Sequence, residues 1–185
     1  MLERTKISID LEAVRSLVRK LEPLFEGNRL FVTARPEAED PLHEPSGWLP
    51  KDVTEASYTE VTPPFRGTVV EDLLNRLPGR WGRARLMRMQ PKTCLSFHRD
   101  DTTRFHLAIV TNPACYLIER EGEHGTFYHV PDDGFVYHVD TRRVHSAMNS
   151  SNEARIHLVV ANLDMTGLPS GKWRDHTSAP VLVAS

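Results

Sequence analysis

The chain has 185 residues, of which 39% are hydrophobic and 26% are charged, as expected for a single soluble domain with its own core. Its 23 Lys and Arg against 25 Asp and Glu give a formal net charge of -2, which argues against nucleic acid as the main partner. There is neither a run of about 18 apolar residues nor an apolar signal-peptide core, so we expect no membrane span and a cytoplasmic location. The two cysteines, Cys94 and Cys115, are expected to be reduced and buried.

The N-terminal part, residues 1–80, is predicted to be helical and loop-like. Asp10 can cap a helix over 11–21, where apolar residues recur at helical spacing. Residues 35–50 are rich in proline and are expected to form a loop. A second helix is predicted over 69–77, just before the Pro-Gly pair that stops it.

From residue 83 onward, short runs of β-forming residues alternate with turn residues. We expect strands over 83–89, 94–98, 104–110, 115–120, 126–130, 135–139, 144–148 and 154–162. About eight short strands predict a mainly β fold, a double-stranded β-helix of the jelly-roll or cupin type, with N-terminal helices packed on the barrel. We expect one domain over 1–185, composed of the N-terminal part (1–80), the β core (83–163) and a C-terminal extension (164–185).

Two of these strands carry an Arg-x-His pair on one face. Because side chains alternate along a strand, Arg104 and His106 share a face, as do Arg155 and His157. Guanidinium groups on an inward face are costly unless an anion meets them, so the pattern predicts a cavity that binds a dicarboxylate. Either arginine could instead pair with an acidic side chain on a neighbouring strand, and either histidine could be an ordinary core residue.

Three residues have the types and spacing of a metal site. His98 and Asp100 are two apart, so both point to one side of an extended segment. His145 lies far enough along the chain to return across the barrel. Two imidazoles and a carboxylate are the ligands of the facial triad of non-haem Fe(II) oxygenases. Asp101 is an alternative ligand to Asp100, and a loop ion pair with Arg104 is the alternative role for the His-x-Asp segment.

Arg155 follows His145 by ten residues and offers a fixed, bidentate fork for a distal carboxylate. This arrangement favours an oxygenase over two other functions of such a barrel. One is a cupin-like protein that binds a small acid without turnover, and the other is a Zn- or Mn-dependent isomerase or hydrolase. Neither alternative gives a reason to place a clamp for a dicarboxylate there.

Residues 83–163 resemble the aspartyl/asparaginyl β-hydroxylase family of 2-oxoglutarate-dependent oxygenases. The resemblance rests on His98, on the run Arg104-Phe105-His106-Leu107, and above all on the run from His145 to Arg155. It implies Fe(II) on the two histidines and 2-oxoglutarate held by Arg155 with help from Arg104 and His106. It also implies hydroxylation of an amino acid or a residue in a peptide, with O2 consumed and succinate and CO2 released.

This sequence departs from the family pattern in two respects. The interval between His98 and Arg104 is shorter than in the animal enzymes, and Asp100 offers a carboxylate where those enzymes have no acidic ligand. We expect the loops over 35–66 and the segment 164–177 to set the substrate specificity. The candidate substrate contacts are Arg88, Trp48 and Tyr58.

Overall fold

The computed structural model describes residues 1–44 and 49–164, and their strands form two main sheets that face each other. The larger sheet contains, in spatial order, β1 (Leu2–Ser8), β10 (Phe135–Val139), β7 (Thr103–Val110), β12 (Arg155–Asn162), β5 (Trp81–Met89) and β2 (Arg29–Phe31). The smaller sheet contains β6 (Thr93–Cys94), β11 (His145–Asn149), β8 (Cys115–Glu121) and β9 (His124–Tyr128). A separate ribbon pairs β3 (Thr33–Ala34) with β4 (Glu60–Val61).

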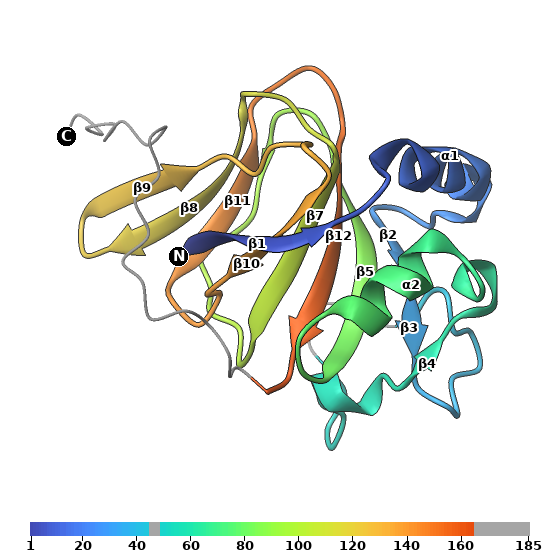
Figure 1. The fold of residues 1–185 in the computed structure, drawn as a ribbon. Coiled ribbons are helices and arrows are strands. Elements are labelled where there is room, and N and C mark those ends of the chain that lie inside the picture. Colours follow the sequence, from blue (N-terminus) through green and yellow to red (C-terminus); the bar gives the residue numbers. More distant parts are fainter. Residues whose placement is uncertain (45–48, 165–185) are drawn as a thin grey trace.

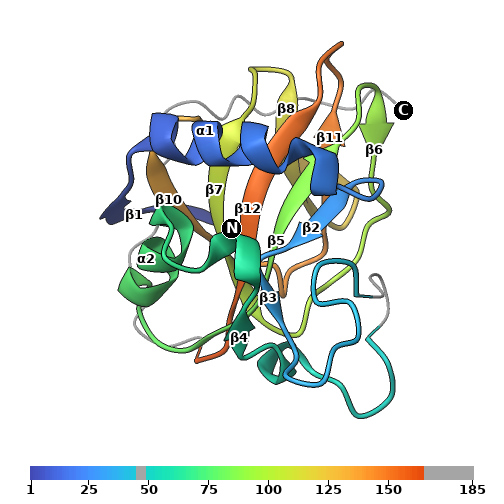
Figure 2. The ribbon, with the colours of Figure 1, turned by 90° about the vertical axis from the view of Figure 1, so that its right-hand side faces the viewer.

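The helices lie on the side of the larger sheet that faces away from the smaller one (Figure 1). They are α1 (Leu11–Leu21) and α2 (Val69–Arg76), with short 3-10 helices η1 (Glu22–Leu24), η2 (Glu55–Ser57) and η3 (Pro63–Phe65). Figure 2 shows α1 crossing in front of β7, β12 and β5. The Asp10 side chain accepts hydrogen bonds from the backbone N–H groups of Glu12 and Ala13, so the predicted cap is confirmed.

The main hydrophobic core lies between the larger sheet and these helices. Phe105 and Leu107 of β7 and Leu158 of β12 pack there against Val14 and Leu73 from the helices. Strand alternation therefore places the opposite faces of β7 and β12 toward the interior of the barrel. A smaller apolar cluster lies in that interior and includes Ala108, Leu117 and Ala147.

The predicted double-stranded β-helix with N-terminal helices on the barrel is confirmed, and each predicted strand region contains a strand. The segment 94–98 is an exception in its length: β6 pairs only over Thr93–Cys94, and His98 then forms an isolated bridge with His145. The sequence prediction also missed four strands before residue 62, β1 to β4. Of these, β1 adds an edge to the larger sheet by pairing Leu2 with Val139 of β10.

The two cysteines differ in their burial. Both cysteines are free, but only Cys115 is buried, whereas Cys94 is exposed. The expectation of burial was wrong for Cys94 because β6 is a short edge strand of the smaller sheet. No helix of the described residues is long and apolar enough to cross a membrane.

Candidate metal centre and adjoining pocket

The structure brings His98, Asp100 and His145 together at the start of β11 in the smaller sheet. One possible ligand atom from each residue lies within 4.8 Å of the other two. The backbones of the two histidines are paired, because each N–H donates to the other's carbonyl oxygen at 2.9 Å, and the ring centroids lie 4.4 Å apart. Asp100 is fixed in turn by a 2.9 Å hydrogen bond from its backbone N–H to the carbonyl oxygen of Thr141.

The hydrogen bonds of the two imidazoles leave one nitrogen of each ring available to a metal. Nδ1 of His98 lies 2.8 Å from the carbonyl oxygen of Ser96, and Nδ1 of His145 lies 3.0 Å from that of Arg143. A carbonyl oxygen only accepts, so Nδ1 carries the proton and Nε2 keeps its lone pair. Burial lowers the pKa of His145, which favours the neutral form that a metal ligand needs.

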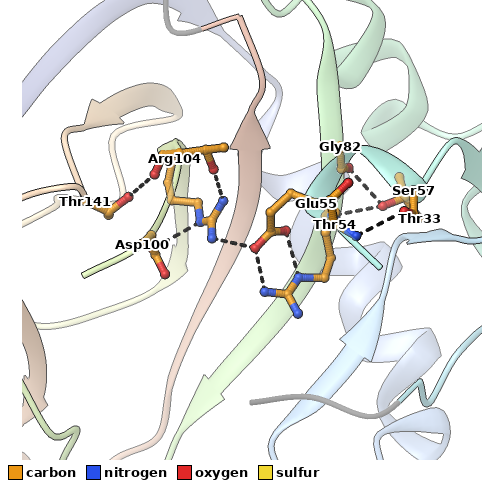
Figure 3. A network of polar contacts seen from close by, with 11 residues as sticks. Thr33, Thr54, Glu55, Ser57, Gly82, Asp100, Arg104 and Thr141 are labelled. Carbon is orange, nitrogen blue, oxygen red and sulfur yellow. Dashed lines mark hydrogen bonds and ion pairs between the residues drawn. The ribbon is translucent and has the colours of Figure 1, made fainter. Parts of the chain in front are cut away.

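A network of ion pairs connects Asp100 through Arg104 to Glu55 of η2 (Figure 3). Nε of Arg104 lies 3.2 Å from Asp100 Oδ2, and its Nη2 donates to Glu55 Oε1 at 2.7 Å. Arg83 donates to both oxygens of the same Glu55 carboxylate, at 2.6 and 2.9 Å. Arg104 was predicted to bind the cosubstrate or to pair with an acidic side chain, and the structure shows the ion pair.

Glu55 reaches this position because η2 packs directly on β5. A Cβ atom added to Gly82 would lie 2.3 Å from the carbonyl oxygen of Glu55, so only glycine permits this approach. The hydroxyl of Thr33 further ties the strands together, donating to the carbonyl oxygen of Gly82 and accepting from the N–H of Ala84.

The three candidate ligands open onto a cavity of about 110 Å³ between the two sheets. Residues of β5, β7, β8, β11 and β12 and of the loops before β7 and after β10 line it: Arg85, Met87, Leu95, His98, Asp100, Arg104, His106, Leu117, Thr141, His145, Ala147, Arg155 and Val159. The metal-ligand candidates and the inward faces of β7 and β12 thus belong to one pocket.

Arg155 lies in this pocket without an anionic partner. Its side chain is buried, its Nε has no hydrogen-bond partner, and no ion pair among the described residues includes it. Burial lowers the pKa of its guanidinium to about 10. A buried and unpaired cation of this kind is costly in the free protein, so the site is suited to an anion that arrives from solution.

The two Arg-x-His histidines of the interior differ in their access to the pocket. Burial, and then the positive charge of Arg155, lower the pKa of His106 well below its ordinary value, and the same two causes act on His157. Both imidazoles are therefore neutral. Only His106 lines the pocket, where its Nδ1 has no partner. His157 is fully buried with neither ring nitrogen bonded.

Sequence reasoning missed two residues of this site, Glu55 and Arg85. Alternation along β5 carries a signal for Arg85. Ala84 and Leu86 belong to the apolar core, so Arg85 and Met87 must face the barrel interior. For Glu55 there was no comparable signal, because it lies on a one-turn helix within a long irregular segment.

The three proposed substrate contacts do not lie in the described part of the pocket. Arg88 is on the outward face of β5, where it pairs with Glu22 at 2.6 Å. Tyr58 is fully buried and stacks on Phe31, with 5.9 Å between ring centroids. Neither Arg88 nor Tyr58 is among the residues that line the cavity. Trp48 and the segment 165–177 lie outside the described residues.

Comparison with known proteins gives one family match. A family model described as aspartyl/asparaginyl β-hydroxylase matches residues 65–163. That range includes all three candidate metal ligands and Arg155. No curated protein matches the chain.

Three solved structures resemble the chain at low sequence identity. An oxidoreductase of the 2OG-Fe(II) oxygenase family from Burkholderia pseudomallei is 12% identical, with a TM-score of 0.50 over 82% of this chain and 76% of that one. AviO1 from Streptomyces viridochromogenes Tue57 is 15% identical, with a TM-score of 0.49 over 92% of each chain. A cupin domain from Bordetella pertussis Tohama I is 14% identical, with a TM-score of 0.37 over 46% of this chain and 85% of that one.

Proposed function

The chain belongs to the aspartyl/asparaginyl β-hydroxylase family, and on that premise we propose that it is a 2-oxoglutarate- and Fe(II)-dependent dioxygenase. The reaction would hydroxylate an amino acid or a residue in a peptide, consume O2 and release succinate and CO2. One observation carries this proposal: two imidazoles, a carboxylate and an unpaired buried arginine line the same cavity.

The donor set fits a ferrous ion. Nε2 of His98, Nε2 of His145 and a carboxylate oxygen of Asp100 make a facial triad, which leaves further coordination positions for cosubstrate and O2. When bound, the iron and 2-oxoglutarate together supply the oxidising chemistry. The protein contributes position, because backbone hydrogen bonds fix both imidazoles and Arg104 holds one carboxylate oxygen of Asp100.

Arg155 would bind the carboxylate of 2-oxoglutarate that is remote from the metal. A bidentate pair with a guanidinium satisfies the unbonded Nε and compensates a charge that the protein leaves unpaired. Neutral His106 lies beside it with a free ring nitrogen that can complete the hydrogen bonds of the same carboxylate. A second carboxylate bound here, beside the metal ligands, favours a dicarboxylate cosubstrate that reaches from Arg155 to the metal centre.

The remaining walls of the cavity would keep water from the reacting atoms. Met87, Leu117 and Val159 line it from three different strands. Apolar walls around the charged groups also strengthen every electrostatic contact inside.

The experiment that tests this function is anaerobic addition of Fe(II) and 2-oxoglutarate, followed by a visible absorption spectrum. We expect the weak charge-transfer band of a 2-oxoglutarate chelate, and its absence from folded protein would refute the proposal. In air, a library of amino acids and peptides is then searched by mass spectrometry for a product heavier by one oxygen atom.

A further inference from the structure

Three guanidinium groups line the pocket, those of Arg85, Arg104 and Arg155. Arg104 is neutralised within the protein by Glu55 and Asp100. Arg155 is the residue that the proposed function assigns to 2-oxoglutarate. Arg85 remains: its Nε is buried without a hydrogen-bond partner, and no ion pair among the residues of the described ranges includes it.

The surroundings of Arg85 are strongly positive. Burial, together with the neighbouring charges of Arg83 and Arg104, lowers the pKa of Arg85 to about 9, and Glu55 opposes this effect. Glu55 does not pair with Arg85; its two oxygens accept from Arg83 and Arg104. Arg85 is half-buried, and its guanidinium carbon lies 5.9 Å from the centre of the Phe31 ring. This contact with a ring face leaves the Nε donor available to an anion from outside the chain.

Arg85 and Arg155 are attached to the paired strands β5 and β12 at well-separated positions. Arg85 lies directly opposite Val159 in the register of β5 and β12, and Val159 is four residues from Arg155. That offset corresponds to about 13 Å between the two backbone positions along the sheet, at the ordinary rise of a strand. A five-carbon diacid separates its carboxyl carbons by about 5 Å, given bonds of about 1.5 Å.

We propose that Arg85 recognises a carboxylate of the substrate and thereby selects acidic over neutral substrates. The inference rests on the proposed function, because the cosubstrate accounts for Arg155. One unpaired guanidinium matches one negative charge, and its planar fork matches a carboxylate. The remaining pocket cations do not compete for this group, because Arg104 is already paired. Arg85 is therefore a specificity-determining residue.

The test uses the intact protein loaded with Mn(II) and saturated with 2-oxoglutarate under anaerobic conditions. The probes are ¹³C-labelled acetate and acetamide, which have the same shape and differ in charge. Mn(II) speeds the relaxation of ¹³C nuclei that bind nearby, so the measured quantity is the paramagnetic relaxation of each probe. We expect acetate to relax faster than acetamide by about tenfold, as for one charge-assisted pair.

The decisive variant is Arg85→Gln, with Arg88→Gln as the control on the outward face of the same strand. We expect Arg85→Gln to abolish the difference between the probes and Arg88→Gln to preserve it. If Arg85→Gln fails to fold, Arg85→Lys keeps the charge without the fork and should retain a reduced preference for acetate. Equal preference for acetate in the Gln or Lys variant and the parent, with Mn(II) and 2-oxoglutarate still bound, would overturn the inference. Failure of the parent to bind either ligand would instead overturn the proposed function, and this inference with it.

Discussion

Replacing Glu55 with Gln tests how the buried ion-pair network supports the candidate metal centre. The change keeps the side-chain shape but removes the charge that compensates both Arg83 and Arg104, which are 6% and 3% exposed. Breaking a buried ion pair by removing one partner costs about 3–5 kcal/mol. Asp100 still partly compensates Arg104 across 3.2 Å, so we expect the lower end, about 3 kcal/mol.

The same substitution should weaken metal binding. Without Glu55, Asp100 is the remaining carboxylate on Arg104, and a stronger pair between them draws the Asp100 carboxylate away from the two histidines. Loss of a partner that orients a metal ligand costs about 10–100-fold in metal affinity. We expect a loss of about tenfold, measured by calorimetric titration with Mn(II) alongside urea denaturation of the metal-free protein.

Glu44→Gln provides a matched control. Glu44 is also buried and pairs with one guanidinium, that of Arg35 at 2.6 Å, but it does not line the pocket. This variant should lose stability and keep its Mn(II) affinity. Unchanged Mn(II) affinity in the Glu55 variant at a comparable loss of stability would refute the positioning role of Glu55.

Three other predictions follow from the same geometry. His145→Ala should abolish Mn(II) binding in a calorimetric titration. Arg155→Ala should preserve Mn(II) binding and weaken 2-oxoglutarate binding by about 10–100-fold, the value of a charge-assisted pair. Intact affinity for 2-oxoglutarate in the Arg155 variant would contradict the role of Arg155. Burial lowers the pKa of His138 to about 4, so the unfolded chain takes up the proton first and stability should fall from about pH 6.5 down to about pH 4, by up to about 3 kcal/mol. Urea midpoints measure this loss, and a His138→Gln variant that keeps the same slope would contradict it. Gly82→Ala should destabilise the protein by several kcal/mol in the same assay, because its Cβ meets the Glu55 carbonyl.

The sequence predicted the β core because its signals are local. Alternation with a period of two assigned Leu107 and Leu158 to one face and His106 and Arg155 to the other, and the structure confirms both faces. Capping and helical spacing likewise placed α1 correctly. The short strands β1 to β4 were missed, because two to seven residues that pair only with distant segments carry little pattern of their own.

Residue types and spacing also selected the candidate metal ligands, and in the structure one ligand atom of each lies within 4.8 Å of the others. Their role as ligands stays a prediction. His98 and Asp100 could be placed on one side from their separation alone. Their proximity to His145 depends on an antiparallel bridge between His98 and His145, which are 47 residues apart. The sequence does not specify this bridge; the folded structure contains it.

The sequence by itself determined which side chains share a face, because that depends on the geometry of a few consecutive residues. Only the tertiary structure decided which charges are paired. Arg104 meets Glu55 from a segment 49 residues away, while Arg85 and Arg155 meet no carboxylate among the described residues. Whether a charge is paired depends on contacts between distant segments. In a pocket, a guanidinium without a carboxylate partner remains available for a ligand.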